Sequence, residues 1–311
     1  MAVFTSYHNF RFDALNPGSM GAGQYLPVPP VVTPTKATVL TTGGAFDVYG
    51  SGLSISPPSG VVTEITFSQN GRVVASVTDI EVPAVSIYMA MQGDSPMDLI
   101  TAVMSERDTY HLGDADDIVP GYGGNDVING GGGTDTSLHD GLRSEYSVKK
   151  LGDGSYEITR GSERDILNDV ELVRFDDGVL RLDVDGNAGQ AFRLYQAVFE
   201  REPDAEGLQY WVNRMDEGNV SLVDIADSFL FSPEFVNTYG TEDTVSNAEF
   251  VDLLYTHTLG RAYDQEGYNY WVGKLDDGAT NRRDLIAQFS ESAENKAQVA
   301  ELISDGIWLG W

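Results

Sequence analysis

The strongest constraint in this sequence is an aspartate that recurs every nine residues within a glycine-rich stretch. Asp108, Asp117, Asp126 and Asp135 follow one another at this interval, and residues 121–138 read GYGGNDVINGGGGTDTSL. Glycine permits tight turns in backbone conformations that residues with a Cβ atom rarely adopt. Two places after each aspartate stand residues that are mostly apolar or favour strands, namely Tyr110, Val119, Ile128 and Ser137. The pattern predicts a short parallel β-roll in which two nonapeptides form one coil.

Such a roll brings residues that are 18 apart to the same flank. It pairs Asp117 with Asp135 on one flank and Asp108 with Asp126 on the other. Carboxylates and the backbone carbonyls of glycine turns form a flexible cage of hard oxygen atoms, which suits Ca²⁺ better than Zn²⁺ or Cu²⁺. The alternative is a Gly/Asp-rich loop without a metal. The predicted calcium ligands come from Asp108, Asp117, Asp126, Asp135, Gly113, Gly121, Gly124, Gly131 and Gly133.

These nonapeptides resemble the calcium-binding repeats of RTX (hemolysin-type) proteins, whose pattern is G-G-x-G-x-D-x-U-x with U apolar. Block 121–129 is a near match, whereas block 130–138 has Ser137 at the apolar position. Block 112–120 keeps only Gly113, Asp117 and Val119, and block 103–111 has no glycine. The resemblance implies bound Ca²⁺ and type I secretion from a Gram-negative bacterium, with an uncleaved signal near the C-terminus.

Composition restricts the possible partners. The 48 acidic and 19 basic residues give a net charge of −29, which repels nucleic acid and anionic membranes and attracts divalent cations. No apolar run is long enough to span a membrane, so membrane insertion is not expected. The N-terminus lacks the basic start and apolar stretch of a cleaved signal peptide.

Enzymatic motifs are scarce. The absence of cysteine excludes disulfides, thiolate catalysis and cysteine-ligated metals. No G-x-S-x-G elbow and no phosphate-binding G-x-x-x-x-G-K-[ST] loop occurs, and no pair of histidines has metal-ligand spacing. The chain is therefore predicted not to be an enzyme. The histidines are His8, His111, His139 and His257.

The first half of the chain favours strands. Residues 1–36 are rich in Gly, Pro and Ser and predict a loop-rich lead-in. VVTEITFSQ and RVVASVTDI flank Asn70-Gly71, a strong hairpin signal, and alternation places Val61, Thr63, Ile65 and Phe67 on one mostly apolar face. EYSVKKLGDGSYEITR predicts a second hairpin, followed by short strands to about residue 183. Before residue 184, a helix is considered only for MDLITAVM (97–104).

The C-terminal part contains a repeat at an offset of 60 residues. LYQAVFEREPDAEGLQYWV (194–212) superposes on LYTHTLGRAYDQEGYNYWV (254–272). Apolar positions at i, i+3, i+4 and i+7 predict a helix before and after each R-x-x-D-x-E-G loop, and Ser221 and Asn281 are the predicted N-caps of a third helix. The Tyr-Trp pairs are either a ligand platform or core residues. The core is favoured because each Trp falls on the apolar stripe.

The signature L-Y-x(5)-R-x-x-D-x-E-G-x-x-Y-W resembles a helical domain of unknown function found in secreted bacterial surface and RTX proteins, distantly similar to phycobilisome linker domains. That resemblance implies a role in protein contacts.

Together these features predict an α+β multidomain chain. An N-terminal antiparallel β domain (1–103) precedes a short β-roll with hairpins (104–183) and an all-α repeat domain (184–311). The predicted function is a secreted calcium-binding structural or adhesive protein in a surface layer or extracellular matrix, which self-associates or contacts other surface proteins or glycans. The alternative is an extracellular glycan-binding module or an accessory of a secreted enzyme.

Overall fold

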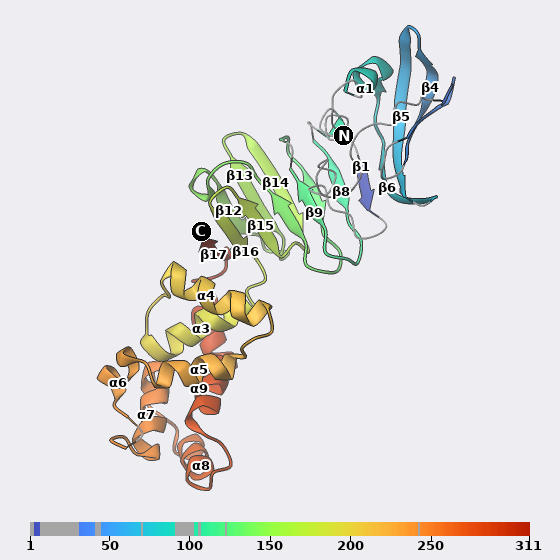
Figure 1. Cartoon of the computed structure of the whole chain (residues 1–311). Coiled ribbons are helices and arrows are strands. Elements are labelled where there is room, and N and C mark those ends of the chain that lie inside the picture. Colours follow the sequence, from blue (N-terminus) through green and yellow to red (C-terminus); the bar gives the residue numbers. More distant parts are fainter. Residues whose placement is uncertain are drawn as a thin grey trace. The chain divides into compact units, whose positions relative to one another are not determined.

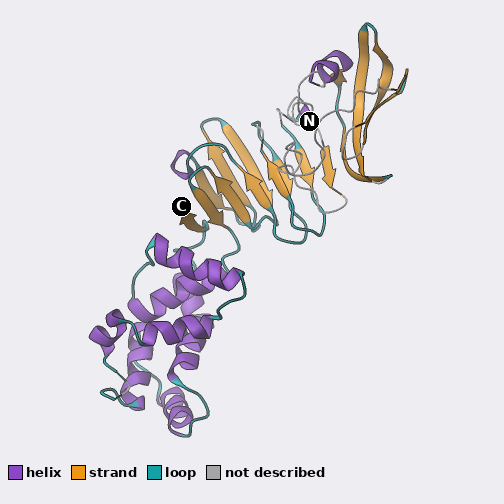
Figure 2. Cartoon of the chain, viewed as in Figure 1, coloured by secondary structure: helices purple, strands orange, loops and turns teal. Residues whose placement is uncertain are grey.

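The computed structural model describes residues 3–6, 31–40, 45–69, 71–90, 103–104, 107–121, 123–241 and 243–311. The chain divides into two compact units, Met1–Val179 and Leu180–Trp311. Strands are the main elements among the described residues of the first unit, and helices are the main elements of the second (Figures 1 and 2), which confirms the predicted α+β class. A boundary at 103/104 within the first unit stays a prediction. Most of the lead-in 1–36 and of segment 97–104 lies outside the described residues.

The first unit begins with an antiparallel meander. Strands β5 and β6 form the predicted hairpin around Asn70-Gly71, and Gly71 has φ +75°, as such a turn requires. Pro83 precedes a short helix, α1 (Ala84–Ala90), which the sequence did not indicate. This helix packs against β5, and its Ile87 is buried. The strands are β2 (Val31–Thr33), β3 (Lys36–Leu40), β4 (Ala45–Ile55), β5 (Pro58–Gln69), β6 (Arg72–Thr78) and β7 (Val82–Pro83).

Strand β5 changes its buried face part way along. Tyr49 of β4 faces Glu64, but the next residue, Gly50, faces Val62, so Thr63 is an extra residue in β5. A bulge of this kind shifts the alternation of side chains by one. Val62 is therefore fully buried and Val61 is 40% exposed, although Ile65 and Phe67 are buried. The predicted apolar face that included Val61 is wrong at this point.

The parallel β-roll consists of three stacked coils. Each coil places one strand in each of two sheets, and the residues that face inward stack in register. Tyr110, Ile128 and Leu167 align on one side, and Val119, Ser137 and Val173 on the other. All six are at most 1% exposed. The strands are β8 (Thr109–His111), β10 (Val127–Asn129) and β14 (Glu163–Asn168) on the first side, and β9 (Ile118–Pro120), β11 (Thr136–Leu138) and β15 (Leu172–Phe175) on the second.

A hairpin interrupts the roll between its second and third coils. Strands β12 (Ser147–Lys150) and β13 (Tyr156–Arg160) pair antiparallel, and β13 continues the sheet next to β14. At the other end of the roll, β1 (Val3–Ser6) pairs parallel with β8 and antiparallel with β6. One sheet therefore continues from the meander into the roll.

The second unit is the predicted helical repeat. The first repeat contains α3 (Asn187–Phe199), α4 (Ala205–Asp216), α5 (Leu222–Leu230) and α6 (Pro233–Tyr239), and the second contains α7 (Asn247–His257), α8 (Gln265–Asp276), α9 (Arg282–Ser290) and α10 (Ala293–Val299). Ser221 and Asn281 are the N-caps of α5 and α9, as predicted. The unit also contains β17 (Ile307–Gly310), which lies beside β16 (Gly178–Arg181).

The apolar positions predicted for the first helix of each repeat are all buried, whereas those of the second helix are only partly buried. The first-helix positions are Ala191, Leu194, Tyr195 and Val198, with Val251, Leu254, Tyr255 and Thr258 in the second repeat. In α4, Leu208, Val212 and Met215 are buried, whereas Leu275 is the buried residue of α8. Trp211 and Trp271 are partly buried and pack against the common core. Tyr210 and Tyr270, beside them, are 53% and 54% exposed. The Tyr-Trp pairs are therefore divided between core and surface.

The R-x-x-D-x-E-G motif stabilises the helical fold. Arg201 forms a two-point ion pair with Glu234 (2.8 and 2.9 Å), and Arg261 does the same with Glu294 (2.6 and 3.0 Å). Asp204 and Asp264 are the N-caps of α4 and α8. The glycine of each motif lies within the helix against a tyrosine hydroxyl, because a Cβ at Gly207 would be 2.7 Å from the Tyr195 oxygen.

Candidate functional site

The four regularly spaced aspartates occupy equivalent places in the roll. Each lies immediately before a short strand: Asp108 before β8, Asp117 before β9, Asp126 before β10 and Asp135 before β11. Each is at most 1% exposed. Charged carboxylates are seldom buried unless they are paired, hydrogen-bonded or bound to a metal. Their burial therefore requires an explanation.

Hydrogen bonds join these aspartates along each flank of the roll. The Asp108 backbone N–H donates to Oδ1 of Asp126 (2.8 Å), and the Asp117 N–H donates to Oδ1 of Asp135 (2.9 Å). These are the two pairs expected from the 18-residue spacing. The structure does not bring all four aspartates into one cluster. It produces two series of carboxylates, which we call the carboxylate ladders.

Each ladder has a further member in the third coil that the sequence analysis missed. The Asp126 N–H donates to Oδ1 of Asp165 (2.8 Å), and the Asp135 N–H donates to Oε2 of Glu171 (2.8 Å). The separations are 39 and 36 residues because the hairpin lies between the coils. A sequence signal was present: RGSERDILN (160–168) shares the D-x-x-N ending of GYGGNDVIN (121–129).

Asparagines confirm that the third coil stacks in the same manner. The Asn168 side-chain NH₂ donates to Oδ1 of Asn129, and the Asn129 NH₂ donates to the Tyr110 carbonyl, each at 3.0 Å. The Gly130 N–H also donates to the Asn168 carbonyl (2.9 Å). The coils are thus held in register by side-chain contacts as well as by strand pairing.

The glycine turns pack closely on one another. Gly124, Gly131 and Gly133 have positive φ angles of 126°, 90° and 106°, whereas Gly113 and Gly121 are not in this region. A Cβ at Gly131 would lie 2.5 Å from the Gly113 carbonyl oxygen. The Gly113 carbonyl in turn accepts a hydrogen bond from the Gly132 N–H (3.0 Å). Position 131 therefore requires glycine for two reasons: its φ angle is positive, and the neighbouring turn leaves no room for a Cβ atom.

Replacing Gly131 by alanine should destabilise the roll by about 2 kcal/mol, because the Cβ meets the neighbouring turn and the φ angle is unfavourable for alanine. Chemical denaturation of the full chain, followed by circular dichroism, measures this change. Gly152→Ala is the matched control, since no atom lies within 4 Å of a Cβ at that position. Equal losses of stability in the two variants would contradict the expectation.

The ladders leave carboxylate oxygens without partners. Oδ2 of Asp126 and Oδ2 of Asp135 are buried and accept no hydrogen bond. Burial raises the pKa of Asp126 to about 8, aided by the negative charges of Asp165, Asp108 and Glu163 and opposed by the Asp108 N–H. Burial likewise raises the pKa of Asp135 to about 7, and the nearby Glu171 charge adds to this rise. A bound cation would supply the missing counter-charge.

The oxygen atoms present fit a hard cation better than a transition metal. Among the described residues, no three His, Cys, Asp or Glu side chains form a group of metal-ligand geometry. A bound ion would therefore depend on turn carbonyls in addition to one or two carboxylates. Ca²⁺ accepts this mixture, because it takes about six to eight oxygen ligands in flexible geometry. The unpartnered Oδ2 atoms and the glycine turns are consistent with such a site.

Ser137, which stands where the repeat pattern expects an apolar residue, has a polar partner inside the roll. Its hydroxyl lies 2.9 Å from Nε2 of His139, two residues along the chain. Burial lowers the pKa of His139 to about 4, so this imidazole is neutral at neutral pH. The His139 ring also packs against Tyr146 and Phe175. These contacts explain how a serine is accommodated at a fully buried position.

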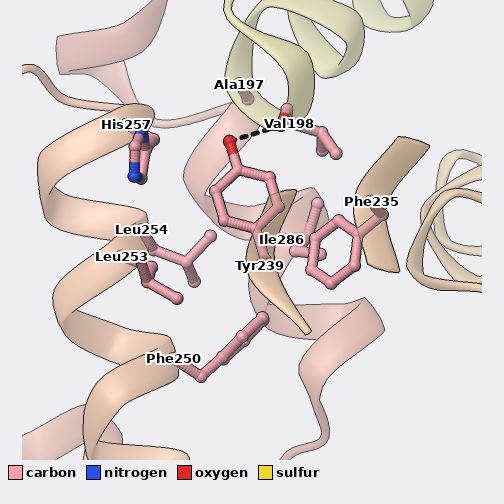
Figure 3. A pocket seen from close by; sticks show the side chains of 9 residues that line it. All are labelled: Ala197, Val198, Phe235, Tyr239, Phe250, Leu253, Leu254, His257 and Ile286. Atoms are coloured by element: carbon pink, nitrogen blue, oxygen red, sulfur yellow. Dashed lines mark hydrogen bonds between the residues drawn. The ribbon is translucent and has the colours of Figure 1, made fainter. Parts of the chain in front are cut away.

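The helical unit contains a small apolar cavity between α3, α6, α7 and α9. Figure 3 shows Phe235, Tyr239 and Leu254 converging on it, and the Tyr239 hydroxyl donates to the Val198 carbonyl (2.8 Å). Its volume of about 10 Å³ leaves room for about one water molecule. It is too small for a ligand.

The fold and the site define a chain that combines a three-coil parallel β-roll, lined by buried carboxylates, with a unit of two helical repeats. Residues 191–225 and 226–299 match a family described as "Domain of unknown function (DUF4214)". The match falls on the helical repeats and names no activity. No curated protein matches the chain. In the part of the chain that the structure describes, no helix is long and apolar enough to cross a membrane.

Proposed function

We propose that this chain is a secreted calcium-binding structural protein of a bacterial surface layer or extracellular matrix. The observation that carries the proposal is the pair of buried, unpartnered Oδ2 atoms, on Asp126 and Asp135, between glycine-rich turns. The RTX resemblance, with its implied type I secretion from a Gram-negative bacterium, supports the location. The net charge of −29 adds a long-range attraction for divalent cations.

Calcium would be held on the two flanks of the roll. On one flank the ligands are Asp108 and Asp126 with carbonyls of the turn that contains Gly121 and Gly124. On the other flank they are Asp117 and Asp135 with carbonyls of the turns that contain Gly113, Gly131 and Gly133. When bound, Ca²⁺ supplies the positive counter-charge that is missing around the buried carboxylates. The roll then becomes a rigid spacer.

Calcium concentration provides the switch from an unfolded to a folded roll. Ions that bind only the folded state stabilise it by mass action. Where calcium is scarce, the carboxylates repel one another and oppose folding. Where it is abundant, outside the cell, the roll folds. This behaviour suits a chain that is exported before it folds.

The structural role predicts that assembly depends on calcium. The helical unit exposes large apolar side chains that suit protein contacts, including Phe231 (70% exposed) and Trp311 (63% exposed). We expect the purified chain to form large assemblies in millimolar calcium and to disperse when a chelator is added. Sedimentation velocity and electron microscopy measure this, with Mg²⁺ as the control ion. A chain that stays monomeric in both conditions would contradict the structural role.

A glycan-binding module is the second candidate, because each helical repeat exposes a tyrosine next to a basic residue. Arg214 lies over the Tyr210 ring and Lys274 over the Tyr270 ring, each 5.5 Å from the ring centroid. A calcium-loaded monomer that binds a glycan array, and loses binding in the Tyr210→Ala/Tyr270→Ala variant, would favour this candidate over the structural role.

A further inference from the structure

We propose that Asp165 and Glu171, the third-coil members of the carboxylate ladders, are cation ligands that form one further site on each flank of the roll. This inference rests on the proposed calcium-binding function and extends it beyond the nonapeptide repeats. Neither residue belongs to a block that the repeat pattern identifies.

The first step concerns the geometry of the ladders. Asp165 accepts a hydrogen bond from the Asp126 N–H in the same way that Asp126 accepts one from the Asp108 N–H. The N to Oδ1 distance is 2.8 Å in both pairs. Leu167, two places after Asp165, faces inward in register with Ile128. If the first two coils hold a cation between their turns, the second and third coils present the equivalent carboxylates for another one.

The second step concerns the space around Asp165. A cavity of about 450 Å³ is lined by residues that include Gly121, Gly123, Asp140, Glu163 and Asp165. A Cβ at Gly121 would be 3.6 Å from Oδ2 of Asp165 and 3.7 Å from the His139 ring. This oxygen therefore lies beside a glycine turn and 3.9 Å from Nδ1 of His139, an imidazole that is neutral at neutral pH because burial lowers its pKa to about 4. The cavity also includes Arg160, whose guanidinium donates to the Asp140 carbonyl and to Tyr146 and Glu145. Carboxylates thus outnumber cationic groups among its lining residues.

The third step concerns the flank of Glu171. The turn between β14 and β15 is only Asp169–Val170–Glu171, shorter than the turn 130–135 on which it stacks. A Cβ at Gly130 would be 1.8 Å from the Asp169 carbonyl oxygen and 2.5 Å from Oδ2 of Asp135. A carbonyl and an unpartnered, buried carboxylate oxygen therefore converge where glycine leaves room. Glutamate, one methylene longer than aspartate, still reaches the Asp135 N–H from the shorter turn.

A purely structural ladder does not account for the second carboxylate oxygen of Asp126 or of Asp135. One acceptor atom satisfies the N–H of the preceding coil, yet Oδ2 of Asp126 and of Asp135 remains buried without a partner. An amide side chain could provide that single acceptor without introducing a charge. Asparagine or glutamine should therefore preserve the hydrogen bond while removing a charged cation ligand, and this difference separates the two roles.

The test uses the full chain with Asp165→Asn, Glu171→Gln and the double variant. Glu81→Gln is the matched control, because Glu81 is an exposed carboxylate of the same unit outside the roll. Isothermal titration with CaCl₂ should show one site fewer, or an affinity at least about tenfold weaker at one site, for each single substitution. The double variant should show both losses and the control neither.

Thermal unfolding in calcium and in chelator provides the second readout. The calcium-induced rise in unfolding temperature should shrink in both variants, while their unfolding temperature in chelator does not fall below that of the wild type. Unchanged calcium stoichiometry and affinity in the variants would overturn the inference and leave the proposed function intact. Equal destabilisation with and without calcium would overturn it in favour of a structural role. A wild-type chain that binds no calcium would overturn both proposals.

Discussion

Removing calcium should unfold the β-roll while the helical unit stays folded. At a calcium concentration of 100 times its dissociation constant, each site contributes about 2.7 kcal/mol, so two sites contribute about 5 kcal/mol. This is a large part of the roughly 5–15 kcal/mol by which an ordinary domain is stable. The roll has a narrow interior of single stacked side chains, and its buried carboxylates oppose folding when no counter-ion is present. The helical unit has a separate core that does not contain these carboxylates.

The placement of tryptophan makes this prediction easy to measure. All four tryptophans, Trp211, Trp271, Trp308 and Trp311, lie in the second unit. Trp308 lies on β17, in the same sheet as roll strands β15, β11 and β9. In a variant with Trp308 and Trp311 replaced by phenylalanine, the fluorescence of Trp211 and Trp271 should change little on addition of chelator. Hydrogen exchange should accelerate strongly across residues 107–179 and remain slow in the helices from α3 to α10. Equal thermal stability of both units with and without chelator would refute the expectation.

Replacing Asp126 and Asp135 by asparagine should change stability in opposite directions with and without calcium. In chelator, each substitution replaces a buried carboxylate that has no counter-ion by a neutral amide, and it keeps an acceptor for the N–H of the preceding coil. Removing the charge should outweigh leaving the amide NH₂ without an acceptor, because an unsatisfied buried charge costs more than the roughly 1–3 kcal/mol of an unsatisfied neutral group. The double variant should therefore be more stable than the wild type. In calcium, the same variant should lose most of the increment of about 5 kcal/mol that two sites provide.

Denaturation curves of the wild type and of the double variant, each measured in calcium and in chelator, test whether the order of their stabilities reverses. Glu81→Gln again controls for the loss of one negative charge, and it should shift neither curve appreciably. If calcium stabilises the Asp126→Asn/Asp135→Asn variant by as much as it stabilises the wild type, calcium binding by these two carboxylates is refuted.

Periodicity determined how much of the fold could be predicted from the sequence. Spacing of 9 and 60 residues identified the roll, its two aspartate pairs and the helical repeats, because regular stacking converts sequence distance into spatial distance. The same reasoning missed Asp165 and Glu171, because the hairpin 147–160 and a shortened turn change the interval to 39 and 36 residues. The predicted apolar face of β5 was wrong at Val61 for a related reason, since the extra residue Thr63 reverses the alternation of side chains.

Other features depend on contacts that no local pattern encodes. The burial of Ser137 requires His139, Tyr146 and Phe175 to meet at the same place in the roll. Helix α1 contains the β-branched residues Val85 and Ile87, which favour strands, yet it is helical and packs against β5 with Ile87 buried. Trp211 and Trp271 lie on the predicted i, i+3, i+4, i+7 stripe but are only partly buried, whereas Tyr210 and Tyr270 lie off that stripe and are more than half exposed.

The hairpin between the second and third coils has a consequence for how this architecture can diversify. The chain leaves the roll after Leu138, forms β12 and β13, and then re-enters the roll in register. Oδ1 of Asp165 accepts from the Asp126 N–H at 2.8 Å, the same distance as between the Asp108 N–H and Asp126, where no hairpin intervenes. The third coil therefore stacks on the second although a hairpin lies between them in the sequence, because the chain re-enters the roll in register. Evolution, or an engineer grafting a peptide at the Gly152–Gly154 tip, can lengthen this branch without altering the stack that carries it.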